Sequence, residues 1–322
     1  MSTPLATLYV YGDSYSDITN SHRKTNGPVW SQRVAQGWGL QLQSYAMVGS
    51  HSCQATGAPS IGLQIDRYSN TMNHQPSSTK DVHAFFIGVT DIINATKYDA
   101  INLVGCIKEQ IMKLQTSDPE AQILLLGIPP LEYSPYYADS KKQTQIKKRV
   151  NEYNVALEDM VTDKIGGATT TLSFVDNNFL FADILGNPAG YGLEEVDKAY
   201  WNQCQGRCED SMDTYLWWDS IHLTGAGHKA IADAIVNKNP FGYTIIQEDT
   251  SQSNNKYNDD GATGLLLYAD DFMEYAPWFM LFCLVAVVVL VLLRPKQGRR
   301  SIVKWSPWKR RKSHAYTAVS SV

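Results

Sequence analysis

The chain has 322 residues, of which 43% are hydrophobic and 19% charged, and its formal net charge is -4 at pH 7. This length accommodates one domain with a full hydrophobic core and additional segments. The charge is unevenly distributed, because residues 294–322 hold nine Lys or Arg and no acid, which leaves 19 basic against 32 acidic residues before them. A main domain with this acidic excess is not expected to bind nucleic acid.

The first predicted strand ends in the stretch "YVYGDSYSD", residues 9–17. Its first residues are apolar and aromatic, as in a buried strand, and Gly12 permits a tight turn that presents Asp13 and Ser14. Because ligands bind at the carboxyl edge of the strands in open α/β sheets, Ser14 is a candidate nucleophile. A simple Asp/Ser turn or a helix N-cap is the alternative interpretation.

Helix-like and strand-like patterns alternate after this strand. A helix is predicted around "VWSQRVAQGWG", followed by a half-buried strand in "LQLQSYAMVG" and a polar loop to about residue 81. The stretch "HAFFIGVTD" predicts a buried strand that ends in another glycine-containing turn. Two amphipathic helices then flank the strand "QILLLGIPP", with apolar residues at three- and four-residue spacing: Val104, Ile107, Ile111 and Leu114 in the first, and Ile146, Val150, Tyr153, Leu157 and Val161 in the second.

The strand "TLSFVD" and a last helix that begins just after residue 224 complete this pattern. Strands that alternate with helices predict a three-layer α/β/α fold with a mainly parallel sheet. The loops at its strand ends carry Ser14, Gly49, Thr90 and Asp176.

A candidate base lies in "WWDSIHLT", residues 217–224. Asp219 stands three residues before His222, so one short segment supplies both a proton acceptor for Ser14 and a carboxylate that orients it. A surface aspartate and a helix-capping histidine produce the same spacing without any catalytic role. His51 is a rival base because it closely follows Gly49, but no carboxylate lies at a comparable spacing from it.

The cysteines favour one small disulfide. Cys204 and Cys208 in "CQGRC" are spaced to close such a bond, whereas Cys53 and Cys106 are expected to be isolated, buried thiols. No metal site is predicted, since no further ligands lie near the cysteine pair at a spacing suited to zinc. The sequon "NAT" at Asn94 is a glycosylation site only if the domain is lumenal.

The run "APWFMLFCLVAVVVLVLL", residues 276–293, contains no charge and is followed by Arg294, which predicts a single transmembrane helix. Residues 248–275 are acidic and polar and are expected to form a linker. The basic tail, residues 294–322, suits an anionic membrane surface, although a solvated tail is the alternative.

The positive-inside rule places this tail in the cytosol and the domain outside it. No signal peptide is visible before the first strand. Either the start of the chain is therefore incomplete, or the protein is tail-anchored with its domain in the cytosol.

Four stretches in this order, "YGDSYSD", "SYAMVGS", "FFIGVTD" and "WWDSIH", resemble the sequence blocks of the GDSL lipase/esterase family of SGNH hydrolases. The resemblance runs from about residue 7 to 237, and "FVDNNFLFADILGNPAGYGL" is similar to fungal acetylesterases of carbohydrate esterase family 16. It implies a flavodoxin-like esterase domain over residues 1–247. It also implies a serine carboxylic-ester hydrolase without metal or cofactor, acting on short acyl or acetyl esters of small molecules or saccharides.

The resemblance also assigns roles to single residues. Ser14 corresponds to the nucleophile and, through its backbone N–H, to an oxyanion donor. Gly49 corresponds to a second backbone donor, where a side chain would obstruct approach. His222 and Asp219 correspond to the other members of the triad.

The third block departs from the family pattern G-x-N-D, because this chain has Thr90 where the family has asparagine. The threonine hydroxyl reaches less far than an amide and can turn to a nearby carbonyl instead. Removal of one oxyanion donor typically costs ~100 to 1,000-fold in turnover, so lowered activity is expected. A membrane-tethered ligand-binding module without turnover and a membrane-associated lipase or lysophospholipase remain alternatives.

Several aromatic residues are candidates to line a sugar- or acyl-binding cleft, and each can equally belong to the core. They are Trp30, Tyr133, Tyr136, Tyr137, Trp217 and Trp218. Nothing in the sequence predicts the oligomeric state.

Overall fold

The computed structural model describes residues 6–19, 24–71, 81–118, 120–162, 171–205, 207–209 and 211–246. The predicted linker, transmembrane helix and basic tail, residues 248–322, lie outside this range. Among the described residues, no helix combines the length and the apolar character needed to cross a membrane.

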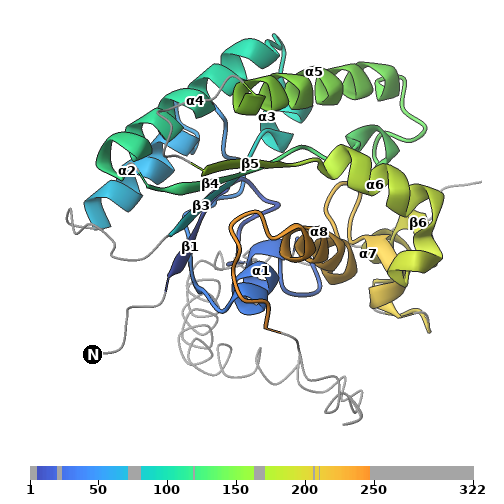
Figure 1. Cartoon of the computed structure of the whole chain (residues 1–322). Helices are drawn as coiled ribbons and strands as arrows, with labels where there is room; N and C mark the ends of the chain where they lie inside the picture. The colour runs from blue at the N-terminus through green and yellow to red at the C-terminus, as the bar shows by residue number, and fades with distance from the viewer. Residues whose placement is uncertain are drawn as a thin grey trace, which may run out of the picture. The chain divides into compact units, whose positions relative to one another are not determined.

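The core of the domain is a five-stranded sheet in which every neighbouring pair of strands is parallel. Helices cover both faces of this sheet, with α1 and α8 on one side and α2, α4 and α5 on the other (Figure 1). The prediction of a mainly parallel α/β fold is therefore confirmed. In spatial order the strands are β2 (Gln41–Ser44), β1 (Thr7–Gly12), β3 (Val82–Phe86), β4 (Gln122–Leu126) and β5 (Thr171–Val175).

The helices bury the faces that their apolar spacing marks. In α4 (Ala100–Ser117) the four predicted apolar positions are all buried, and in α5 (Gln143–Thr162) only Val161 of the predicted five is partly exposed. The side chain of Thr224 caps the N-terminus of α8 by accepting a hydrogen bond from Gly227 N–H at 3.1 Å. The other long helices are α1 (Trp30–Trp38), α2 (Ile61–Thr71) and α8 (Gly225–Lys238).

The prediction of a polar loop up to residue 81 is wrong, because part of this segment forms helix α2. The buried face of α2 consists of Ile61, Gln64, Ile65 and Tyr68, so a polar residue interrupts the apolar pattern. Gln64 can be fully buried because its amide bonds to both the N–H and the C=O of Gly12, each at 2.8 Å. These partners come from β1, and the local sequence does not show them.

A second, two-stranded parallel sheet follows the main one and was not predicted. Its second strand leads directly into the segment that carries Asp219 and His222. The remaining elements are α3 (Val89–Asn94), η1 (Leu131–Tyr133), α6 (Asn177–Gly186), η2 (Pro188–Tyr191), β6 (Glu195–Ala199), α7 (Tyr200–Cys204), η3 (Met212–Thr214) and β7 (Tyr215–Trp217).

The register of the main sheet determines which loops meet. Gly12 at the end of β1 pairs with Phe86 at the end of β3, and Val10 pairs with Ser44 at the end of β2. Because these strands are parallel, their carboxyl ends lie at one edge of the sheet. The segments after these strands, which carry Ser14, Gly49 and Thr90, therefore emerge next to one another.

Candidate active site

His222 lies within hydrogen-bonding distance of both Ser14 and Asp219, with one imidazole nitrogen facing each. The Nε2 atom of His222 is 3.0 Å from Ser14 Oγ, and its Nδ1 atom is 2.9 and 2.8 Å from the two carboxylate oxygens of Asp219. When Nδ1–H donates to the carboxylate, the lone pair of Nε2 faces the serine hydroxyl. This tautomer can accept a proton from Ser14.

Hydrogen bonds within the segment 218–222, and one from Tyr15, fix the position of His222. Asp219 Oδ1 also accepts from the backbone N–H groups of Ile221 and His222, at 2.9 and 2.8 Å. The backbone N–H of Trp218 donates to the His222 carbonyl at 2.8 Å, and the Tyr15 hydroxyl donates to the carbonyl of Ile221. These bonds hold the imidazole at one orientation relative to Ser14.

The surroundings of Asp219 favour its charged form. Partial burial disfavours the carboxylate, but its hydrogen bond and its Coulombic interaction with His222, together with the two backbone N–H groups, outweigh burial. The pKa of Asp219 consequently lies below its ordinary value. A carboxylate in this state stabilises an imidazolium on His222 without taking its proton.

Asp13 joins the nucleophile loop to the loop after β3, a role that sequence reasoning missed. Its fully buried carboxylate accepts from the backbone N–H of Tyr15 at 3.2 Å, of Val89 at 3.1 Å and of Thr90 at 3.5 Å. Burial raises the pKa of Asp13 to about 7, although these N–H groups act in the opposite direction. The only signal for this role in the sequence was an acidic residue between a buried strand and the candidate nucleophile.

Gly49 lies on the loop after β2, beside the end of β1. The backbone N–H of Met47 donates to the Gly12 carbonyl at 3.1 Å, which anchors this loop to the strand that precedes Ser14. Gly49 has a φ of 76°, and a Cβ added to it would meet no atom within 4 Å. The left-handed backbone, and not contact with a protein atom, is therefore what favours glycine here.

Thr90 lies in the first turn of α3 and is 9% exposed. Its backbone N–H faces Asp13, so this group is already engaged. Its hydroxyl makes no hydrogen bond with any residue in the described part of the chain, and it has not turned to a neighbouring carbonyl. The hydroxyl is therefore available to a ligand.

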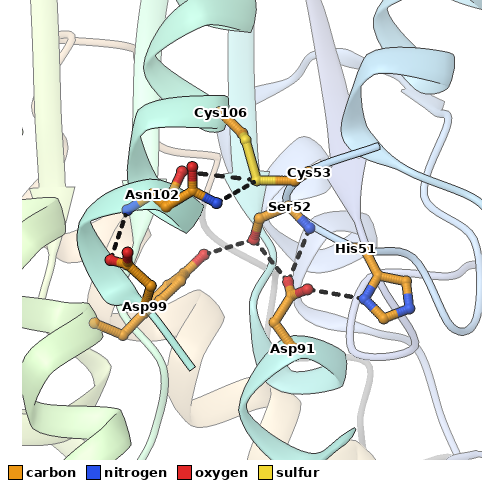
Figure 2. The surroundings of a disulfide bond; sticks show 8 residues. His51, Ser52, Cys53, Asp91, Asp99, Asn102 and Cys106 are labelled. Carbon is orange, nitrogen blue, oxygen red and sulfur yellow. Dashed lines mark hydrogen bonds and ion pairs between the residues drawn. A yellow bond between two sulfur atoms is a disulfide. The ribbon is translucent and has the colours of Figure 1, made fainter. Parts of the chain in front are cut away.

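His51 has a carboxylate partner that its sequence spacing did not reveal. Its Nδ1 atom lies 2.8 Å from Asp91 Oδ1, as Figure 2 shows. Asp91 stands 40 positions away in the sequence and reaches His51 only because α3 packs beside the loop after β2. Within the described residues, the histidine that contacts Ser14 is His222 and not His51.

All four cysteines of the described residues form disulfides. The last residue of α7, Cys204, forms a disulfide with Cys208, which follows the helix. Cys53 and Cys106 are also joined, so the expectation of isolated thiols is wrong. Their Cα atoms lie 5.2 Å apart although 53 positions separate them, because the loop after β2 packs against α4.

Asn94 lies at the exposed end of α3. The described residues contain no group of three or more His, Cys, Asp or Glu arranged to hold a metal ion.

The candidate aromatic residues divide into two groups. Trp30, Tyr137, Trp217 and Trp218 are buried and belong to the packed interior, whereas Tyr133 and Tyr136 are exposed. Tyr136 N–H donates to the Ser220 carbonyl at 2.9 Å, beside Asp219.

Trp201 is a further exposed aromatic residue that sequence reasoning missed. Its backbone N–H donates to the Trp218 carbonyl at 2.8 Å, and its ring lies 5.3 Å from that of Trp218. Trp201 and Tyr136 are thus bonded, through their backbones, to positions directly before and directly after Asp219.

Comparison with known proteins supplies one family match. The model of the family described as GDSL-like lipase/acylhydrolase matches residues 8–235 of this chain. No curated protein matches the chain.

Solved structures similar to this chain have low sequence identity. A lipolytic protein of the G-D-S-L family from Veillonella parvula is 12% identical, with 74% of this chain and 100% of that chain covered and a TM-score of 0.49. The acetyl xylan esterase AlAXEase is 16% identical, with coverages of 72% and 98% and a TM-score of 0.46. Axe2, an acetylxylan esterase from Geobacillus stearothermophilus, is 14% identical, with coverages of 76% and 97% and a TM-score of 0.47.

Proposed function

The chain belongs to the GDSL-like lipase/acylhydrolase family and is a carboxylic ester hydrolase, and from this premise we propose that Ser14, His222 and Asp219 are its catalytic triad. The observation that carries the proposal is the 3.0 Å contact between Ser14 Oγ and His222 Nε2, with Asp219 on the other imidazole nitrogen. A hydroxyl, a base and an orienting carboxylate in this order are what acyl transfer through a serine requires.

The proposed reaction has two halves. Ser14 Oγ attacks the ester carbonyl carbon while its proton passes to His222 Nε2, which forms a tetrahedral oxyanion. The C–O bond to the alcohol then breaks, and His222 returns the proton to the departing alkoxide. A water molecule then attacks the acyl-enzyme while its proton passes to His222, and a second tetrahedral intermediate forms. When this intermediate collapses, the bond between the acyl carbon and Ser14 Oγ breaks, His222 returns the proton to Ser14 Oγ, and the carboxylic acid is released.

Three groups at the same sheet edge are the proposed oxyanion donors: the backbone N–H of Ser14, the backbone N–H of Gly49 and the hydroxyl of Thr90. Support comes from their positions after β1, β2 and β3, which are adjacent strands with aligned carboxyl ends. The free hydroxyl of Thr90 also supports this role. Asp13 contributes indirectly, because it holds the backbone of Thr90 next to the nucleophile loop.

Substitution of Thr90 tests this arrangement. We expect Thr90→Asn to raise kcat ~10-fold or more with little change in KM, because a longer amide donor bonds best to charge that exists only in the transition state. Thr90→Val keeps the shape but removes the hydroxyl and should lower kcat. Steady-state kinetics of both variants on one chromogenic ester provide the measurement.

The two substitutions must change kcat in opposite directions. An unchanged kcat in Thr90→Val, together with a lower kcat in Thr90→Asn, would exclude Thr90 as a donor. The backbone N–H of Thr90 would not be the substitute, because it faces the Asp13 carboxylate.

Short acyl or acetyl esters, including acetylated saccharides, are the proposed substrates. Trp201 and Tyr136 support this choice, because these exposed residues, 40% and 59% accessible, are bonded through their backbones to the positions before and after Asp219. Exposed aromatic faces of this kind offer apolar area with a polar edge, which suits sugar rings.

The experiment that tests the function is hydrolysis of p-nitrophenyl esters of increasing acyl length and of acetylated xylo-oligosaccharides, with Ser14→Ala in parallel. A preference for acetyl esters is expected. A preference for long acyl chains would favour the lipase or lysophospholipase alternative. No turnover above Ser14→Ala on any ester would favour a ligand-binding module.

We also propose that residues 276–293 span a membrane and that the esterase domain is extracytoplasmic. The two disulfides support an oxidising compartment, where such bonds persist. Expressed in eukaryotic cells, the full chain should resist alkaline extraction from membranes and carry a glycan that peptide N-glycosidase removes and that Asn94→Gln lacks. A membrane-bound protein with no glycan and with alkylatable cysteines would instead indicate a tail-anchored protein with a cytosolic domain.

A further inference from the structure

Gly49 lies on a loop of residues 47–53, here termed the Gly49 loop. The carboxylate of Asp91 holds this loop at residues after Gly49. Asp91 Oδ1 lies 2.8 Å from His51 Nδ1, and Asp91 Oδ2 accepts from both the backbone N–H and the hydroxyl of Ser52, each at 2.8 Å (Figure 2). Three donors of one loop thus converge on a side chain that is 6% exposed. Bonds from one carboxylate to three donors restrict the loop strongly, because bonds to a charged acceptor are the stronger class.

Two further contacts fasten the same loop. Ser52 Oγ lies 3.1 Å from the hydroxyl of Tyr153, which donates to the Ile87 carbonyl at 2.8 Å. The Cys53–Cys106 disulfide joins the end of the loop covalently to α4. The downstream end of the Gly49 loop is therefore connected to α3, α4 and α5.

The nucleophile strand holds the Gly49 loop on both sides of Gly49, at Met47 before it and at Ser50 after it. Met47 N–H donates to the Gly12 carbonyl at 3.1 Å, and the amide of Gln64 bonds both to Gly12 and to Ser50 Oγ, at 2.8 Å each. Gly49 lies between Met47, which is bonded to β1, and the anchored residues 50–53. Its backbone N–H can keep a constant position relative to Ser14 only while the anchors on both sides hold.

We propose that Asp91 is a positioning residue that sets the backbone N–H of Gly49 for the oxyanion, and that the Cys53–Cys106 disulfide is a second constraint on the same loop. The inference rests on the proposed function, in which Gly49 is an oxyanion donor. Asp91 directly follows Thr90 in α3. One residue therefore couples two proposed donors, Thr90 through the chain and Gly49 through its hydrogen bonds.

Asp91→Asn tests the inference. The amide has one acceptor oxygen and cannot accept from all three donors, so the Gly49 loop should lose its set position. We expect kcat to fall ~10-fold or more, a fraction of the loss of a whole oxyanion donor, with KM changed little. The affinity for a phosphonate or boronate that mimics the tetrahedral intermediate should fall with kcat, which loss of folded protein alone would not produce.

Asp66→Asn is the matched control, because Asp66 is a half-exposed carboxylate paired with Lys113 on the surface. It should leave kcat and analogue affinity unchanged. If Asp91→Asn fails to fold, the same two quantities are compared between variants that each lack one disulfide. Cys53→Ser/Cys106→Ser should lower kcat and analogue affinity together, and more than Cys204→Ser/Cys208→Ser does.

The outcomes separate this inference from the proposed function. Wild-type kcat in both Asp91→Asn and Cys53→Ser/Cys106→Ser, with Ser14→Ala inactive, would overturn the positioning role and leave ester hydrolysis intact. A wild-type protein without any Ser14-dependent turnover would overturn both. A rise in KM with unchanged kcat would also overturn the inference, since it would assign the loop to ground-state binding.

Discussion

Ser14→Ala and His222→Ala are each expected to reduce ester turnover to near background while the domain remains folded. Ser14 Oγ and His222 Nε2 lie 3.0 Å apart and act in one proton transfer of the proposed mechanism, so removal of either group should abolish the same step. In serine hydrolases such losses are on the order of 10⁴- to 10⁶-fold in kcat, and they do not add. The double variant should therefore be no slower than either single variant.

The measurement is kcat on a p-nitrophenyl ester, together with circular dichroism and thermal unfolding of each variant. Asp219→Asn extends the series, because the amide favours the wrong imidazole tautomer and should also cost a large factor in kcat. A loss in His51→Ala as large as that in His222→Ala, with the fold preserved, would transfer the role of base to His51. Additive losses in the double variant would contradict a single proton-transfer unit.

Gly88→Ala is expected to have the largest effect on stability. Gly88 has a φ of 125°, and a Cβ there would lie 2.5 Å from Cζ and 2.6 Å from the hydroxyl oxygen of Tyr153. Tyr153 is fully buried and bonded to the Ile87 carbonyl, so its ring has no free space into which to move. Backbone strain of about 1–3 kcal/mol and overpacking of about 1–3 kcal/mol should together lower the free energy of unfolding by roughly 2–6 kcal/mol.

Urea denaturation of the esterase domain, residues 1–247, measures this change. Gly105→Ala is the matched control, because a Cβ at that position in α4 would meet no atom within 4 Å. It should raise the free energy of unfolding by about 0.5–1 kcal/mol, the difference in helix propensity between the two residues. A Gly88→Ala domain with the same urea midpoint as the wild type would show that Tyr153 does not occupy the space beside Gly88.

Much of the fold is encoded in short-range patterns. The helices α4, α5 and α8 and the strands β1, β3, β4 and β5 follow from apolar spacing and from glycine or proline at their ends. A helix or a buried strand repeats its contacts over a few residues, so its signal survives in a single sequence. Alternation of the two then predicts the parallel sheet and the edge at which its loops meet.

Helix α2 and the small β6–β7 sheet show the limit of these patterns. Gln64 breaks the apolar face of α2, and only the backbone of Gly12 explains why an amide is buried there. The strands β6 and β7 are short and pair with each other across the α7 segment. Both cases depend on partners that are remote in the sequence, which local propensity does not register.

The candidate site likewise contains residues that local sequence indicated and contacts that only the tertiary structure shows. Asp219 and His222 were candidates because three positions separate them, and Ser14 because it follows a recognisable strand. The resemblance to the GDSL family then assigned the three residues to one triad. Their contact joins residues 208 positions apart and depends on the packing of the last helix against the sheet. The bond between Cys53 and Cys106, the pair of His51 and Asp91 and the role of Asp13 were decided by tertiary structure alone, because each joins separate elements whose approach no local pattern encodes.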